Sequence, residues 1–265
     1  MTGFDPATVQ AALAGASLPW SVRFYPSVDS TMSVARALAD AGVAAGTVVV
    51  ADEQTAGRGR MGRGWVSPPG ENLYFTILLR PTQAVLRRLA MIAPLAVAEG
   101  IEAQTGLRAE IKWPNDVQLR GLKCSGVLID TELRGDGAAL ALVGIGIDVN
   151  QDVSGVPEIA GLATSLRLET GREVDRTALL AAVLQAFDRR YAEAAAGGNV
   201  AAAWKARLNT LGRSVTVSGV GLHEEGIVED VDADGSLLLR RDDGALLTIP
   251  AGEVSLRPIA PPADR

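Results

Sequence analysis

The chain has 265 residues, 48% of them hydrophobic, and its 31 acidic and 25 basic side chains leave a net charge of −6. Such a chain can bury a sizeable core, which excludes a disordered protein and a miniature disulfide-held scaffold. The acidic balance disfavours a protein that coats nucleic acid. Its one cysteine and one histidine exclude an internal disulfide, a cysteine-cluster metal site and the two-histidine zinc motifs.

The sequence also lacks the signals of membrane insertion and export. No apolar run approaches the roughly 20 residues that a transmembrane helix needs. The first 20 residues contain neither a basic start nor an apolar stretch, and an export signal requires both. We therefore expect a cytoplasmic protein with no membrane partner.

Short helices and strands alternate through the first half of the chain. Asp5 followed by Pro6 is typical of a helix start, because an N-cap carboxylate and a proline in the first turn both suit helix geometry. Pro94 predicts a kink in the helix 84–104. The predicted helices are 6–14, 33–41 and 84–104, and the predicted strands are 22–25, 47–51 and 73–79.

The second half changes character after Gly212. Before it, the pattern predicts strands at 109–113, 124–133 and 139–149 and helices at 175–196 and 200–208. After it, Asp234-Gly235 and Asp243-Gly244 indicate tight hairpins between short strands at 214–218, 226–231, 237–240 and 246–249. We predict a mixed α/β domain over 1–211 and a small all-β domain over 212–265.

The segment 54–70 interrupts this pattern and is predicted to be a loop. Its first part, QTAGRGRMGRGW, alternates glycine with arginine. Glycines let a backbone fold tightly, and guanidinium groups bind anions from several sides. Composition alone favours three readings equally: an anion cradle, a solvated basic loop and an RNA-binding patch. The negative net charge lowers the weight of the RNA-binding patch.

A second segment, KWPND, spans Lys112 to Asp116 and is followed by Lys123. Its amide and carboxylate could orient a hydroxyl or hold Mg²⁺, which proteins commonly bind through a carboxylate and a substrate phosphate. A simple turn after the proline, with Lys112 exposed, is the more frequent outcome for such a sequence. Two of the three lysines of the chain lie here, which makes the functional site and the simple turn more nearly equal as interpretations.

A third segment, VGIGIDVN at 143–150, resembles a dinucleotide fingerprint only superficially. The third glycine is absent and no helix follows, so a Rossmann site is excluded. Glycines inside a strand mark either the close approach of a ligand to the backbone or tight packing of a buried strand. The sequence leaves both interpretations open.

Together these segments resemble the biotin protein ligases. The matching segments share the family's order and spacing over about residues 22–257, and they are DST at 29–31, QTAGRGRMGRGW at 54–65, KWPND at 112–116, Lys123 with Gly126, GIGIDVN at 144–150 and ATSL at 163–166. The resemblance implies a mixed α/β catalytic domain related to class II aminoacyl-tRNA synthetases, followed by an SH3-like β-barrel.

The resemblance also implies a two-step reaction. The biotin carboxylate attacks the α-phosphate of ATP, with Mg²⁺ as cofactor, to give biotinyl-5′-adenylate and pyrophosphate. A lysine of a biotin carboxyl carrier domain, expected in an acyl-CoA carboxylase, then takes the biotinyl group and AMP leaves. About 20 residues precede the first matching strand, too few for the winged helix-turn-helix of ligases that double as repressors. We therefore expect a monofunctional ligase without a nucleic-acid partner, and the resemblance leaves room for a weak homodimer.

The family's functional residues are carried over by position. Lys123 and Arg60 are implied as catalytic residues, and Asp116 as the Mg²⁺ ligand. The implied biotin-binding residues are Ser30, Thr31, Met32, Gln54, Arg58, Gly59, Arg60 and Lys123. The implied ATP and adenylate contacts are Gly57, Arg63, Trp65, Asn115, Asp116, Glu253 and Arg257.

Four positions depart from the family pattern. Met32 and Asp148 stand where asparagine is common, Asp130 where glutamate is frequent, and Met61 where the loop often has a cation. A lipoate or octanoate transferase is an alternative function within the superfamily, although such proteins lack both KWPND and the Gly-Arg loop. A non-catalytic biotin-sensing or nucleic-acid-binding module is an alternative of another class.

Overall fold

The computed structural model describes residues 4–133, 139–156, 159–219, 221–251 and 254–259. A seven-stranded mixed sheet forms its centre, in the order β1-β2-β3-β7-β6-β5-β4. Its strands are β1 (Ser21–Val28), β2 (Thr47–Gln54), β3 (Leu73–Leu79), β4 (Glu110–Lys112), β5 (Asp116–Leu119), β6 (Leu122–Leu133) and β7 (Ala139–Ile147). β1 is parallel to β2, and the other neighbours are antiparallel.

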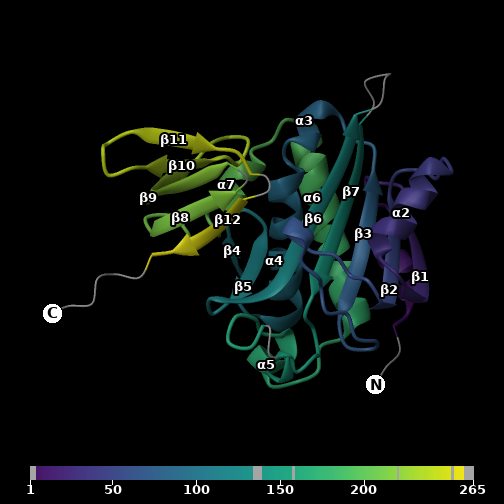
Figure 1. The fold of residues 1–265 in the computed structure, drawn as a ribbon. Coiled ribbons are helices and arrows are strands. Elements are labelled where there is room, and N and C mark those ends of the chain that lie inside the picture. Colours follow the sequence, from purple (N-terminus) through teal and green to yellow (C-terminus); the bar gives the residue numbers. More distant parts are fainter. Residues whose placement is uncertain (1–3, 134–138, 157–158, 220, 252–253, 260–265) are drawn as a thin grey trace.

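A second, five-stranded antiparallel sheet follows, in the order β11-β10-β9-β8-β12. Its strands are β8 (Ser214–Gly219), β9 (Leu222–Val231), β10 (Leu237–Arg240), β11 (Leu246–Ile249) and β12 (Val254–Pro258). Figure 1 shows this C-terminal sheet on the side of β4, away from β1. The predicted fold class, a mixed α/β sheet followed by a small β unit, is confirmed.

Helices cover both faces of the large sheet. They are α1 (Pro6–Ala12), α2 (Thr31–Asp40), α3 (Gln83–Leu86), α4 (Leu89–Thr105), α5 (Leu166–Thr170), α6 (Arg176–Ala195) and α7 (Val200–Lys205). The alternation of β2 separates the two faces: Val48 and Val50 join the main core with α4 and α6, whereas Val49 packs under α2. No helix within the described ranges is long and apolar enough to cross a membrane.

The structure corrects several predicted elements. The predicted helix 84–104 is two helices, α3 and α4, which are separated at Arg87 and Arg88. Pro94 is the sixth residue of α4, where the missing N–H removes one intrahelical hydrogen bond. The sequence pattern missed β5, α5 and β12. Each has four or five residues, too few to display a clear period.

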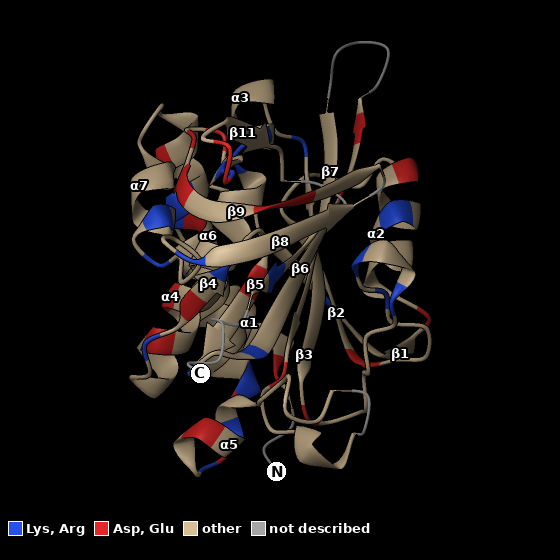
Figure 2. Cartoon of the chain, turned by 60° about the vertical axis from the view of Figure 1, so that its left-hand side comes forward, with Lys and Arg blue, Asp and Glu red and all other residues tan. Residues whose placement is uncertain are grey.

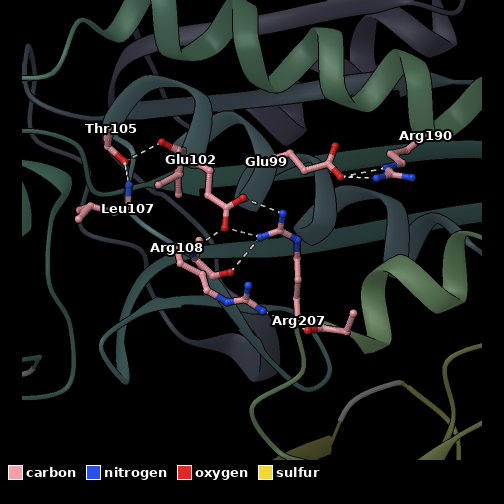
Figure 3. Close-up of polar contacts among 10 residues, drawn as sticks. Glu99, Glu102, Thr105, Leu107, Arg108, Arg190 and Arg207 are labelled. Carbon is pink, nitrogen blue, oxygen red and sulfur yellow. Dashed lines mark hydrogen bonds and ion pairs between the residues drawn. The ribbon is translucent and has the colours of Figure 1, made fainter.

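An ion-pair cluster on the helical side fixes the connection between the two sheets (Figure 3). Arg207 donates to both carboxylate oxygens of Glu102 on α4, at 2.6 and 2.7 Å, and to the carbonyl of Ala109. The backbone of the same segment pairs with β4, because Ile111 donates to the Arg207 carbonyl. The bidentate geometry, together with this backbone pairing, holds the chain where it turns toward β8.

The C-terminal sheet docks through the turn between β9 and β10. The indole nitrogen of Trp113 donates to the carbonyl of Gly235 at 2.9 Å, and both groups are buried. Gly235 has a φ of +84°, and a Cβ there would lie 3.2 Å from Met91. Trp204 is also close to this turn. The predicted Asp-Gly hairpin is thus confirmed, and its tip lies against the segment that carries KWPND.

Gly100 allows the close crossing of α4 and α6 and gives a test of this packing. A Cβ at Gly100 would lie 2.5 Å from Val183 Cγ2 and 2.9 Å from its Cα. Overpacking of this kind costs about 1–3 kcal/mol, more than the up to ~1 kcal/mol that alanine gains in helix propensity. We expect Gly100→Ala to lower the urea midpoint, whereas Gly155→Ala, which has open space, leaves it unchanged. An unchanged midpoint in Gly100→Ala would contradict the crossing described here.

Candidate active site

One face of β7 carries apolar side chains where α2 packs on it and small or polar residues beyond the end of α2. Leu140 and Leu142 on this face pack against α2. Because side chains alternate along a strand, Gly144 and Gly146 occupy the same face farther along, followed by Asp148. Three successive positions therefore carry no bulky side chain. β3 and β7 carry no charged residue at all (Figure 2), so the charges of the site come from neighbouring strands and loops.

A cavity of about 1240 Å³ lies on this open face. It is lined by the start of α2, the Gly-Arg loop, β4 to β7 and the C-terminal sheet. Pockets for a single small ligand usually measure 300–1,000 Å³. The cavity therefore has room for two substrates.

The start of α2 contributes a network of hydroxyl and amide groups. Ser30 caps the helix, and its Oγ accepts a hydrogen bond from the backbone of Met32. Gln54 Oε1 accepts from both the backbone N–H and the hydroxyl of Thr31, at 2.9 and 3.1 Å. Thr76 on β3 donates to the Thr31 hydroxyl. Ser30, Thr31 and Gln54 line one end of the cavity, and these hydrogen bonds hold their side chains in fixed orientations.

The Gly-Arg loop folds back on itself. The N–H of Trp65 donates to the Gly57 carbonyl, the N–H of Gly59 donates to Arg63, and Arg58 and Gly64 form a β-bridge. A Cβ on Gly57 would lie 2.5 Å from the Trp65 carbonyl oxygen. Only glycine fits there, because two backbone segments meet at this point.

The Trp65 ring lies across the glycines of β6 and β7. A Cβ on Gly146 would approach the ring to 2.5 Å, and one on Gly126 to 3.1 Å. Lys123 Nζ is 5.3 Å from the ring centroid, within the range of a cation–π contact. The indole nitrogen is buried and has no hydrogen-bond partner among the described residues.

Met32 covers the third glycine. Its sulfur would lie 2.7 Å from a Cβ on Gly144, and its side chain is buried. The glycines thus admit Met32 and Trp65 close to the backbone. Of the two interpretations of this strand, tight packing applies, because the groups that approach the glycines are side chains of the same chain.

The KWPND segment forms one wall of the cavity. Asn115 Oδ1 accepts from Arg60 of the loop, and its Nδ2 donates to the Val127 carbonyl. Asp116 forms an ion pair with Lys123, 2.6 Å between Nζ and Oδ1. This side-chain network, and not a solvated turn alone, links three segments that are far apart in the sequence. The backbone of Lys123 also forms hydrogen bonds with that of Leu162 and Thr164, at the start of the ATSL segment.

Burial shifts the pKa of two charged groups in the cavity. Asp148 is 5% exposed, and desolvation raises its pKa to about 7, against the opposing effect of Lys123. Asn72 donates to Asp148 Oδ1 at 3.4 Å. Burial also lowers the pKa of Lys112, an effect that Asp116 opposes and that the cations Lys123, Arg257 and Arg63 reinforce.

The donor set fits a magnesium ion held partly by substrate. The described residues contain no group of three or more His, Cys, Asp or Glu side chains arranged as a metal site. Asp116 offers one carboxylate on the cavity wall. Mg²⁺ typically binds one or two carboxylates together with waters and substrate phosphates, so a single carboxylate beside a phosphate position is compatible with it.

The structure gathers most of the predicted site residues around the cavity. Those that line it are Ser30, Thr31, Met32, Gln54, Arg58, Gly59, Arg60, Arg63, Trp65, Asn115, Asp116, Lys123 and Arg257. Gly57 does not line the cavity, and its carbonyl accepts the hydrogen bond from Trp65 that closes the loop. Glu253 lies outside the described residues.

Sequence reasoning missed other residues that line the cavity, namely Lys112, Arg120, Asp148, Gln151 and Arg213. Lys112 and Asp148 lie inside segments that the sequence had singled out, and the scarcity of lysine was the available signal for Lys112. No feature of the sequence marked Arg213 as a site residue, because its place in the cavity depends on how the second sheet packs against the first.

The comparisons with known proteins agree with this geometry. Residues 24–150 match the biotin/lipoate A/B protein ligase family, and residues 210–257 match the biotin protein ligase C-terminal domain. The biotin–[acetyl-CoA-carboxylase] ligase of Paracoccus denitrificans is 38% identical over 85% of this chain and 96% of its own length. The chain belongs to the biotin protein ligase family.

Further members support the same assignment. The biotin–[acetyl-CoA-carboxylase] ligase of Mycobacterium tuberculosis is 31% identical over 94% of both chains. The solved biotin protein ligase from Aquifex aeolicus in complex with biotin and ATP superposes with a TM-score of 0.77 at 33% identity, covering 90% of this chain and 99% of that one. The N-terminal family model includes lipoate enzymes, but the C-terminal model and these relatives place the chain among the biotin ligases.

Asp148 provides a pH test of the buried cavity face. Its folded pKa of about 7 lies above the ordinary value of 3.8, so between about pH 4 and 7 the folded state holds a proton that the unfolded chain has released. The free energy of unfolding therefore falls as pH rises through this window. Asparagine does not titrate. We expect the melting temperature of Asp148→Asn relative to wild type to be higher at pH 8 than at pH 5.

Asp242→Asn is the matched control, because Asp242 is exposed on the turn between β10 and β11. Its melting temperature is expected to follow that of the wild type at both pH values. Parallel pH profiles for Asp148→Asn and wild type would contradict this prediction, because they would mean that Asp148 is protonated to the same extent in the folded and the unfolded chain.

Proposed function

We propose that this protein joins biotin to ATP as biotinyl-5′-adenylate and then transfers the biotinyl group to a lysine of a biotin carboxyl carrier domain. The observation that carries the proposal is the Lys123–Asp116 ion pair between the Gly-Arg loop and the open face of β6 and β7. Relatives named as ligases of acetyl-CoA carboxylase support an acyl-CoA carboxylase as the source of the carrier. A cytoplasmic location remains a prediction from the sequence.

The first step has to bring two anions together, a carboxylate and a triphosphate. Lys123 supplies a compact ammonium between them, a geometry that a planar guanidinium fills poorly. Arg60 adds a second cation and is oriented by Asn115. Such preorganised positive charge stabilises the negative charge that develops on the α-phosphate. Biotin itself is assigned to the end of the cavity lined by Ser30, Thr31, Met32 and Gln54, with Arg58 and Gly59 at its edge.

Magnesium is the proposed cofactor, with Asp116 as its protein ligand. When bound, the ion supplies further positive charge on the phosphate oxygens. Asn115, Arg63, Trp65 and Arg257 are assigned to the nucleotide, as is Glu253. Asp116 forms an ion pair with Lys123 on the wall of the cavity.

The Gly-Arg loop is assigned the role of a cover over the adenylate. A mixed anhydride hydrolyses readily, so a segment that excludes water protects it until the carrier arrives. The second step then needs little catalytic equipment, because the acceptor amine only has to lose a proton near a carbonyl that is already activated.

Pyrophosphate release separates the proposed function from its alternatives. The protein is incubated with ATP and Mg²⁺ and either biotin or lipoate. We expect pyrophosphate with biotin only. Release with lipoate would favour the lipoate transferase, and release with neither would favour a non-catalytic module.

Lys123→Ala is expected to lower the rate of biotin-dependent pyrophosphate release about 10²–10³-fold, the size of effect seen when one preorganised electrostatic group is removed. The circular dichroism spectrum and melting temperature should stay close to wild type, because Lys123 is partly exposed. Lys205→Ala is the control, since Lys205 pairs with Asp230 outside the cavity. Near-normal turnover of Lys123→Ala would remove it from the mechanism.

Gly57→Ser tests the covering role of the loop. The added Cβ would lie 2.5 Å from the Trp65 carbonyl oxygen, so the loop cannot close in its present form. We expect the adenylate to escape and to biotinylate bystander proteins several-fold more than wild type does, measured by blotting an added non-substrate protein. Arg60→Ala should act in the same direction. Gly64→Ser has ordinary space and is the control. An active Gly57→Ser enzyme that leaves bystanders clean would refute the covering role.

A further inference from the structure

The tip of the Gly-Arg loop is a tight turn that contains an unusual residue. The N–H of Arg63 donates to the Arg60 carbonyl at 3.2 Å, and the two residues between them have positive φ, +57° at Met61 and +70° at Gly62. Glycine and short polar residues adopt this left-handed conformation readily, whereas a long side chain rarely does. Met61 is therefore held at the tip by the hydrogen bonds of the surrounding loop.

Met61 is also the methionine that solvent reaches. It is 45% exposed, whereas Met32 and Met91 are 4% and 1% exposed. Met1 lies outside the described residues. Because an oxidant must touch a thioether sulfur to oxidise it, exposure decides which methionine reacts first. Among the described methionines this one is Met61.

The thiol near the site does not compete for an oxidant. Cys124 follows Lys123 on β6, and its side chain is fully buried. Burial raises the pKa of this thiol, and thiols react with oxidants as thiolates. Cys124 is thus shielded both from solvent and from ionisation.

The Met61 sulfur lies next to a guanidinium of the cavity. Nη2 of Arg63 is 3.8 Å from Sδ of Met61, and both residues line the cavity. A thioether sulfur is only a weak hydrogen-bond acceptor. Oxidation makes this side chain polar, and a hydrogen bond from a guanidinium to the new oxygen is charge-assisted and therefore stronger. One added oxygen atom converts a weak contact into a strong one.

We propose that Met61 is a site of reversible oxidation and that the oxygen of its sulfoxide binds the Arg63 guanidinium. The effect on activity rests on the proposed function, which assigns Arg63 to the nucleotide. A guanidinium bound to the sulfoxide is no longer available to ATP, so oxidation lowers the affinity for ATP. The modification thereby slows the first step of the reaction.

The modification is the transfer of one oxygen atom from a peroxide. A lone pair of Sδ attacks one oxygen of hydrogen peroxide, the S–O bond forms and the O–O bond breaks. The departing oxygen takes up the proton of the transferred oxygen and leaves as water. Sulfur loses two electrons, and the peroxide gains them. A methionine sulfoxide reductase with a dithiol reverses the change, releasing the oxygen as water and leaving a disulfide.

Mild treatment with hydrogen peroxide tests the site. Peptide mass spectrometry is expected to find the added oxygen on Met61 before it appears on Met32 or Met91. Calorimetry should find ATP binding weakened about tenfold, as expected when a hydrogen bond to a charged group is lost. Methionine sulfoxide reductases with dithiothreitol should restore the affinity. Met61→Leu, which has a similar volume and no sulfur, should bind ATP equally before and after treatment.

Met91→Leu is the matched control, because Met91 is buried in the main core. Peroxide should weaken its ATP binding as it does in the wild type. Arg63→Gln tests the route of the effect. We expect it to bind ATP weakly before treatment and no more weakly afterwards, although Met61 is still oxidised, because the two changes act through one group. A further loss of affinity in this variant would contradict the binding of Arg63 by the sulfoxide.

Three results would overturn the inference: oxidation of Met91 ahead of Met61, unchanged ATP affinity once Met61 is oxidised, and an equal loss of affinity in treated Met61→Leu. ATP binding is measured without biotin, which separates this inference from the proposed function. If the wild type releases no pyrophosphate with biotin but loses ATP affinity when Met61 is oxidised, the proposed function fails and the inference is supported. If it releases pyrophosphate with biotin and oxidised Met61 leaves ATP binding unchanged, the inference fails and the proposed function stands.

Discussion

The ion pair between Lys123 and Asp116 is the contact on which the rest of the site depends. It connects β6 with β5 at the 2.6 Å separation of a charge-assisted hydrogen bond. The Gly-Arg loop, the end of β7 and the ATSL segment all lie around Lys123. Asp116 places a carboxylate among the cations that line the cavity.

The sheet makes this arrangement compatible with a stable core. One face of β7 is apolar throughout and belongs to the main core with α4 and α6. The opposite face is covered by α2 over its first half and carries glycine or aspartate over its second half. A single strand thus stabilises the fold on one side and leaves room for substrates on the other. The cost of the open face is reduced by Trp65 and Met32, which lie against the glycines and shield the backbone.

The sequence predicted the segments of the site better than it predicted how they meet. β3, β10 and β11 have the predicted bounds, because each is an apolar run between clear turn signals. The Gly-Arg loop and KWPND were recognisable because each is contiguous in the sequence and has an unusual composition. β5 was missed because its four residues follow Pro114 and Asn115 and read as a turn. The contribution of Arg213 was unpredictable, since nothing local distinguishes it from other surface arginines. The boundary near residue 211 remains a prediction, although the second family model begins at residue 210.

The hydrogen bond from Trp113 to Gly235 has a consequence for how the two sheets depend on each other. Trp113 lies directly between Lys112 and the Pro-Asn-Asp turn, so the docked hairpin contacts this wall of the cavity through the Trp113 side chain. Removing the C-terminal sheet would expose apolar surface of Trp113, Trp204 and Met91, which are buried in the structure. The catalytic half is therefore not an independent unit to which a β module has been added. The wall of the cavity is complete only with the last fifth of the polypeptide packed against it.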